Sequence, residues 1–90
     1  MLDGPSGGPQ IEFPLDWEGR VLARADAAAV PAQIGQVLRA FGLAAEPVPV
    51  NRSSQGRYVT YAVRLTIPDR VAWQQLCYAL SRIEGVRSVF

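Results

Sequence analysis

The chain has 90 residues, 49% of them hydrophobic, which is enough for one small domain with a single core. Nine basic residues, all of them arginine, stand against eight acidic ones, and this balance argues against a dedicated DNA-binding or membrane-surface protein. There is no histidine, no lysine and only one cysteine, so the usual ligands of zinc, iron–sulfur and haem sites are missing, as is the lysine for Schiff-base or carrier chemistry. We therefore expect a protein without metal, cofactor or enzymatic activity.

The first ten residues differ in composition from the rest of the chain. Residues 4–9 read Gly-Pro-Ser-Gly-Gly-Pro, which predicts a flexible tail at residues 1–10 ahead of a single domain at residues 11–90. No apolar run approaches the roughly 20 residues of a membrane-spanning helix, and the first residues lack the pattern of a secretory signal. We therefore expect a cytoplasmic protein that does not contact a membrane.

The first two elements follow from periodicity. Residues 17–25 alternate between apolar and charged side chains over most of their length, which predicts a strand. A helix is predicted next, because apolar residues recur at helical spacing from Val30 to Phe41. Pro31 suits the first turn of this helix, where its missing N–H costs nothing, and Gly42 is a stop signal.

The middle of the chain predicts a hairpin. A short second strand is expected around residues 48–50, and Pro47 and Pro49 favour placing it at an edge of the sheet. Residues 53–57 contain serine and glycine and are typical of a hairpin loop. Residues 58–67 form the clearest strand, because apolar side chains occupy every second position throughout.

The last third predicts a helix and a strand. Asp69 is a suitable N-cap for the helix, and Gly85 ends it before a final strand at residues 86–90. The apolar stripe of this helix consists of Trp73, Leu76, Cys77, Leu80 and Ile83. The order β-α-β-β-α-β, with right-handed crossovers, predicts an α+β ferredoxin-like sandwich. This fold has a four-stranded antiparallel sheet with two helices on one face, and the first and third strands lie in its middle.

Several segments resemble the YbeD-like family of bacterial proteins. They are Glu12-Phe13-Pro14, Arg20-Val21, the hairpin Ser53-Ser54-Gln55-Gly56-Arg57-Tyr58, the helix residues Leu76, Tyr78 and Leu80, and the terminal Val86-Arg87-Ser88-Val89-Phe90. The resemblance covers residues 12–90 and implies a ferredoxin-like fold similar to the ACT type of small-molecule-sensing regulatory domain. The family's biochemical role is unknown, so the resemblance implies a regulatory or binding role by analogy. Gln55 stands where the family usually has lysine, and Ala23 where it usually has glycine.

The hairpin is the first candidate binding site. Its residues Ser53, Ser54, Gln55, Gly56 and Arg57 offer hydroxyls, turn N–H groups and a guanidinium, which together suit an anion. The alternative interpretation is a solvated turn in which serine and glycine serve the backbone geometry.

The sheet face that the helices leave uncovered is the second candidate. The residues predicted to form this partner face are Arg20, Leu22, Arg24, Tyr58 and Arg64. Such a mixed apolar and cationic face suits a partner protein, a second copy of the chain, or single-stranded RNA stacked on Tyr58. The lone tyrosine and the balanced charge argue against nucleic acid. Trp73 and Cys77 lie one helical turn apart and are expected in the core rather than as a reactive pair.

Taken together, these patterns favour a small cytoplasmic regulatory or adaptor module that binds a small metabolite or a partner protein. We expect it to form a homodimer, because open faces and strand edges invite pairing. The alternative is a domain that contacts an anion or RNA through the arginine-bearing hairpin and the open face.

Overall fold

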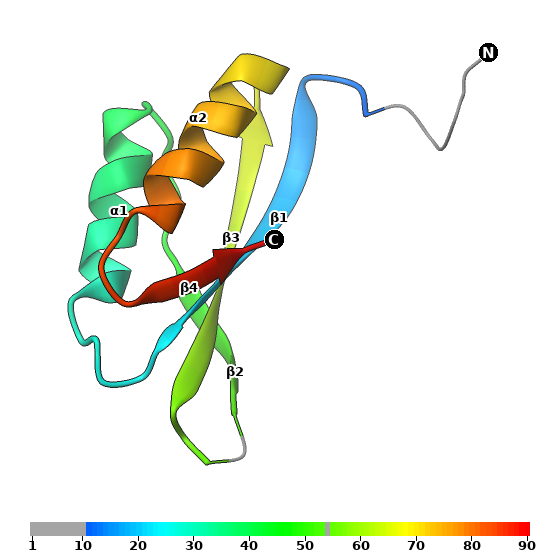
Figure 1. Ribbon diagram of the computed structural model, residues 1–90. Helices are drawn as coiled ribbons and strands as arrows, with labels where there is room; N and C mark the ends of the chain where they lie inside the picture. The colour runs from blue at the N-terminus through cyan, green and yellow to red at the C-terminus, as the bar shows by residue number, and fades with distance from the viewer. Residues whose placement is uncertain (1–10, 54) are drawn as a thin grey trace.

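The computed structural model describes residues 11–53 and 55–90, and it contains two helices packed on a four-stranded sheet (Figure 1). The elements are β1 (Leu15–Arg24), α1 (Val30–Ala40), β2 (Val48–Arg52), β3 (Tyr58–Ile67), α2 (Arg70–Ser81) and β4 (Val86–Val89). The predicted tail at residues 1–10 and Ser54 of the hairpin lie outside the described residues.

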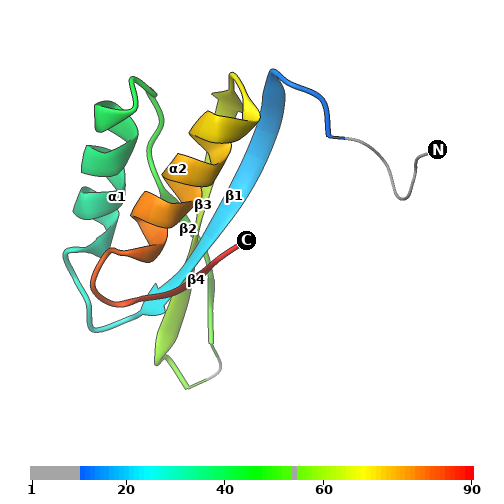
Figure 2. The same ribbon diagram turned by 45° about the horizontal axis from the view of Figure 1, so that its top comes forward.

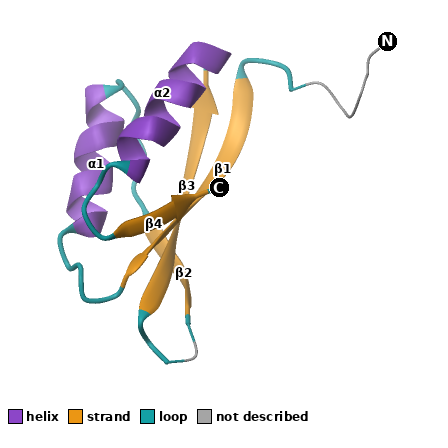
Figure 3. Ribbon diagram, viewed as in Figure 1, coloured by secondary structure: helices purple, strands orange, loops and turns teal. Residues whose placement is uncertain are grey.

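The sheet confirms the predicted ferredoxin-like topology. Its strand order is β2-β3-β1-β4 and every neighbouring pair is antiparallel. The first and third strands therefore lie in the middle, and the proline-bearing β2 lies at an edge as expected. Both helices cover the same face of the sheet and lie side by side (Figures 2 and 3). No helix of residues 11–53 or 55–90 lies on the opposite face.

The two central strands form a ribbon that is longer than its neighbours. β1 and β3 pair without interruption from Leu15 opposite Ile67 to Arg24 opposite Tyr58. β1 starts two residues earlier than its alternation predicted, because β3 continues to Ile67 and provides a partner for each of the extra residues. β2 pairs with β3 only as far as Ala62, so the outer edge of β3 beyond that residue faces the α1–β2 loop.

The helices begin and end largely where the sequence indicated. Asp69 caps α2, because its Oδ1 accepts a hydrogen bond from the backbone N–H of Ala72 at 2.8 Å. Pro31 occupies the first turn of α1. Gly42 follows the C-cap of α1 with a φ of 73°, which a glycine adopts without the steric cost of a side chain. Gly85 was predicted to end the second helix, but α2 ends earlier, at Ser81 with Arg82 as its C-cap, and Gly85 lies in the turn before β4 with a φ of 96°.

The core lies between the helices and the covered sheet face. Its fully buried side chains with the largest volumes are Ile34, Leu38, Ile67, Leu76, Leu80, Val21, Val30 and Val63. In α2 the predicted stripe is confirmed at Leu76 and Leu80, whereas Trp73 and Cys77 are half-buried at its flanks. Ile83 was also predicted in this stripe, but it follows the end of α2 and packs against the core from the turn before β4. Trp73 instead joins Phe13 and Trp17 in an aromatic cluster beside the core.

Candidate functional site

The uncovered sheet face brings together every residue predicted for the partner face. Side chains of directly paired residues in an antiparallel sheet point to the same side. In the β1–β3 pairing, Glu18 lies opposite Arg64, Arg20 opposite Ala62, Leu22 opposite Thr60, and Arg24 opposite Tyr58. We call this surface the open face.

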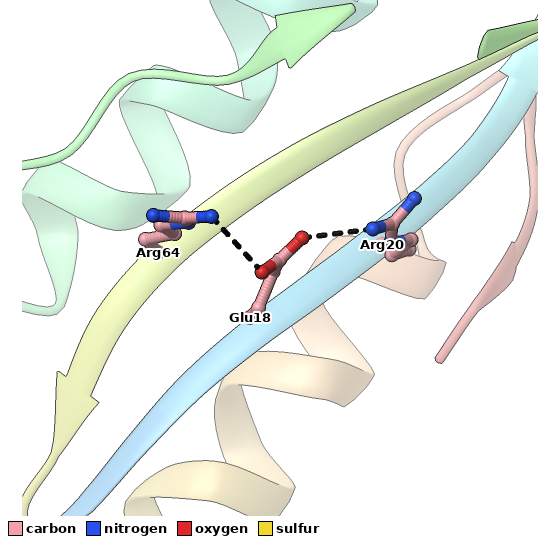
Figure 4. A network of polar contacts seen from close by, with 3 residues as sticks. All are labelled: Glu18, Arg20 and Arg64. Carbon is pink, nitrogen blue, oxygen red and sulfur yellow. Dashed lines mark hydrogen bonds and ion pairs between the residues drawn. The ribbon is translucent and has the colours of Figure 1, made fainter. Parts of the chain in front are cut away.

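Two of the predicted arginines are joined by an acidic residue that the prediction did not include. Glu18 Oε2 accepts from Arg20 Nη2 at 2.8 Å, and Glu18 Oε1 lies 3.4 Å from Arg64 Nη2 (Figure 4). All three side chains are solvent-accessible, so each pair contributes at most about 1 kcal/mol to stability. The effect of the network is to neutralise part of the positive charge in the middle of the open face.

The open face is bordered by exposed apolar side chains from the two outer strands. Val48 lies opposite Ala62 and is 55% exposed, and the neighbouring Val50 is 46% exposed. Phe90 is 60% exposed and joins the face because its backbone exchanges two hydrogen bonds with Arg20, of 2.7 and 2.8 Å. By contrast Thr60 and Ala62 are each only 9% exposed, because these small side chains lie between larger neighbours. The sequence placed Val48 on a strand but gave no sign that it borders this surface.

Two adjoining hollows follow the outer edge of β3. One of about 470 Å³ is lined by residues from β2, from the centre of the open face and from the α1–β2 loop, including Glu46 and Val48. The other, of about 620 Å³, continues along β3 from Arg64 to Thr66, past the first residue of β2, Val48. Both are lined by Glu18, Ala44 and Arg64. The hollows arise because β2 is shorter than β3 and leaves part of the β3 edge uncovered.

Some of the hairpin groups that were predicted to bind a ligand form hydrogen bonds within the turn. Ser53 Oγ accepts hydrogen bonds from the backbone N–H groups of Arg57 and Tyr58, each at 3.1 Å. The N–H of Gly56 donates to the carbonyl of Ser53 at 2.9 Å, and Gly56 has a φ of 71°. Ser53 and Gly56 therefore serve the turn, as the alternative interpretation proposed, while Gln55 and Arg57 are exposed. Ser54 lies outside the described residues.

Tyr58, the residue considered for RNA stacking, already contacts a guanidinium. The Arg87 guanidinium carbon lies 5.7 Å from the centre of its ring, and Arg87 Nη1 donates to Tyr58 Oη at 3.1 Å. Arg87 was not among the predicted site residues. A base that stacked on this side of the ring would first have to displace the arginine.

The thiol of Cys77 is half-buried, and burial raises its pKa. A raised pKa lowers the fraction of thiolate, which is the reactive form, at neutral pH. We therefore expect iodoacetamide to alkylate Cys77 more slowly in the native protein than in urea-unfolded protein, with the native rate rising as the pH increases. Mass spectrometry of timed samples measures both rates. Equal rates would show that the thiol is accessible and reactive in the fold.

Two further findings concern metals and membranes. Within residues 11–53 and 55–90, no three acidic or cysteine side chains are grouped so that they could hold a metal ion. Neither helix of this part of the chain has the length and apolar character needed to cross a bilayer.

The sequence matches a family model over residues 8–90, and the family is described as a protein of unknown function, DUF493. This match confirms the resemblance to the YbeD-like family. A search of curated proteins found no significant match.

Solved structures show the same fold at low sequence identity. Protein HP0495 from H. pylori is 14% identical, with a TM-score of 0.76 over 92% of this chain and 88% of that one. The ACT domain from GTP pyrophosphokinase of Chlorobium tepidum is 20% identical, with a TM-score of 0.61 over 81% and 92% of the two chains. The C-terminal domain of the MgtC protein from Mycobacterium tuberculosis is 21% identical, with a TM-score of 0.60 over 88% and 87%.

Proposed function

Since the chain belongs to the DUF493 family, whose function is unknown, we propose that it is a non-catalytic, cytoplasmic regulatory or adaptor module. In this proposal it acts as a homodimer whose interface is the part of the open face around Arg64 and Val48, away from the hairpin. Two of the similar structures are domains taken from longer proteins, an ACT domain of a GTP pyrophosphokinase and the C-terminal domain of MgtC. They support a module of this size by analogy of fold.

The proposal is carried by the exposed apolar groups on the sheet face that no helix covers. Val48, Val50 and Phe90 are each about half exposed, and they border charges that partly neutralise one another through Glu18. Burying such side chains against another surface is favourable by roughly 25 cal/mol for each Å² of apolar area removed from water. Neutralised charges at the centre lower the cost of removing water from the face.

A second copy of the chain suits this surface because the surface carries exposed charges of both signs, which can pair between two copies. Arg64, whose side chain is 83% exposed, and Glu46, which is also exposed, line the same hollow. In the proposed two-fold symmetric dimer Arg64 of each copy contacts Glu46 of the other, so that this ion pair occurs twice. The interface would cover Val48 and Val50 at the same time.

Charge reversal tests this arrangement. Arg64→Glu and Glu46→Arg should each place like charges across the interface and raise the dimer dissociation constant at least about tenfold. The double variant Arg64→Glu/Glu46→Arg restores opposite charges and should recover most of the wild-type affinity. Sedimentation equilibrium or light scattering over a range of micromolar concentrations measures the dissociation constant.

Arg82→Glu is the matched control, since it makes the same charge change at the end of α2, in the helix layer on the other side of the sheet, where Arg82 contacts Tyr78. It should leave the dissociation constant unchanged. A wild-type protein that is monomeric at every concentration would rule out the second copy. Equal weakening by all three single variants, without recovery in the double variant, would place the interface elsewhere.

A further inference from the structure

We propose that the hairpin end of the open face binds a small phosphorylated molecule, whose phosphate is held by Arg24, Arg57 and Arg87 around Tyr58. The sequence analysis did not group these residues. It assigned Arg57 to the hairpin site, Arg24 and Tyr58 to the partner face, and Arg87 to neither. This inference goes beyond the dimer proposed above and concerns a different part of the sheet.

Strand register brings the three arginines to the same end of the sheet, around Tyr58. Arg24 of β1 lies directly opposite Tyr58 of β3, and Arg57 precedes Tyr58 with its carbonyl bonded to the N–H of Ala25 at 2.8 Å. Arg87 arrives from β4 through an irregularity. Val86 pairs with Ala23 and Ser88 with Leu22, so Arg87 is the extra residue of a bulge. Its side chain reaches Tyr58 across the width of β1.

Positive charge is concentrated at this end of the protein. A hollow of about 370 Å³ is lined by Arg24, Asp26, Gly56, Arg57 and Tyr58. Asp26 is the only carboxylate among these lining residues, and its Oδ1 lies 3.2 Å from Arg24 Nε. Arg24 and Arg57 line this hollow, and Arg87 contacts Tyr58 beside it. Together with Asp26 these four side chains carry an excess of two positive charges, whereas the whole chain has a formal net charge of only +1. An anion bound among these side chains would reduce the repulsion between their positive charges.

The chemistry of these groups suits a phosphate. Guanidinium groups match the oxygens of a phosphate with two parallel hydrogen bonds, and two excess positive charges match a dianion better than a single carboxylate. The contact with Tyr58 already orients Arg87, so less side-chain freedom is lost when a ligand binds. The phenol of Tyr58 accepts from Arg87 and keeps its own hydrogen as a donor.

A small molecule fits better than a nucleic acid strand. The arginine cluster occupies one end of the open face, and toward the other end β1 carries Asp16 and Glu18. A polyanionic strand laid along the face would be repelled there, and its binding normally needs a basic stripe. The hairpin end also projects beyond the helices, which leaves it accessible to a ligand (Figure 1).

Binding can be measured with inorganic phosphate and pyrophosphate as probes. Each is titrated at constant ionic strength into ¹⁵N-labelled protein, and the arginine Nε–H and backbone signals are followed by NMR. We expect saturable shifts centred on Arg24, Arg57, Tyr58 and Arg87, with tighter binding of pyrophosphate if the natural ligand carries a polyphosphate. Tighter binding of inorganic phosphate would indicate a single phosphate group. Arg57→Gln and Arg87→Gln should each weaken binding about tenfold, as expected for the loss of a charge-assisted contact.

Arg39→Gln, on α1, is the matched control and should leave the affinity unchanged. Arg64→Glu should also bind the probe normally, because Arg64 lies toward the other end of the face, so this result is independent of the dimer. Shifts that never saturate, or equal weakening by Arg39→Gln, would overturn the site. A short single-stranded RNA that binds more tightly than pyrophosphate and loses affinity steeply with salt would overturn the assignment to a small molecule.

Discussion

Replacing Trp73 by alanine is expected to lower the free energy of unfolding by about 3–5 kcal/mol. The centre of the Trp73 ring lies 6.1 Å from that of Trp17, in an edge-to-face arrangement, and 6.0 Å from that of Phe13. Trp73 therefore joins α2 to the start of β1. Its truncation opens a cavity beside the core and removes both aromatic contacts. A domain of this length has only roughly 4–13 kcal/mol of stability, so the variant should be close to unfolding. Urea denaturation followed by circular dichroism measures the change.

Two further variants test whether the loss of stability is specific to Trp73 or follows from any large substitution in α2. Trp73→Phe keeps most of the apolar volume and removes the indole Nε1, a buried N–H with no hydrogen-bond partner among the described residues. Its cost should therefore be well below that of alanine. Tyr78→Ala removes an exposed ring that contacts Arg82 from the same helix, and it should cost less than about 1 kcal/mol. A Trp73→Ala variant no worse than Tyr78→Ala would show that Trp73 does not pack against the core.

The fold was predictable from the sequence because its signals are local and agree with one another. Alternation over residues 58–67 identified β3 and both of its faces, and Asp69 identified the start of α2. Pro47 and Pro49 placed β2 at an edge, which the observed strand order confirms. Each of these features depends on a residue's own conformational preference or on a fixed period, so none required knowledge of distant contacts.

The candidate sites were only partly predictable, because they depend on register and on long side chains. Alternation placed Arg24 and Tyr58 on the open face, but the bulge that turns Arg87 toward Tyr58 is an irregularity of pairing between two strands far apart in sequence. Glu18 was not predicted as a site residue, because its contact with Arg64 depends on the β1–β3 register. The partial burial of Trp73 reflects the aromatic cluster that forms only when β1 and α2 come together.

Gly19→Ala is expected to destabilise the protein by about 1–3 kcal/mol, although alanine normally suits a strand better than glycine. Gly19 lies two residues after Trp17 on the covered side of β1, and the indole ring lies over it. A β-carbon at Gly19 would come within 2.6 Å of the indole atoms Cζ2 and Cζ3. The indole would have to move, and with it the contact between Trp17 and Trp73.

A double-mutant cycle with Trp17→Ala identifies the cause. Once the indole is absent, nothing opposes the added methyl group, and Gly19→Ala should become neutral or stabilising by up to about 1 kcal/mol. Gly42→Ala provides the contrast, because its cost comes from a φ of 73° and not from a neighbouring side chain. That cost should be the same with and without Trp17. Urea denaturation of the three single variants and of the two double variants with Trp17→Ala gives the coupling free energy of each glycine with Trp17. A Gly19→Ala effect that is equally unfavourable with and without Trp17 would mean that the indole does not lie over Gly19.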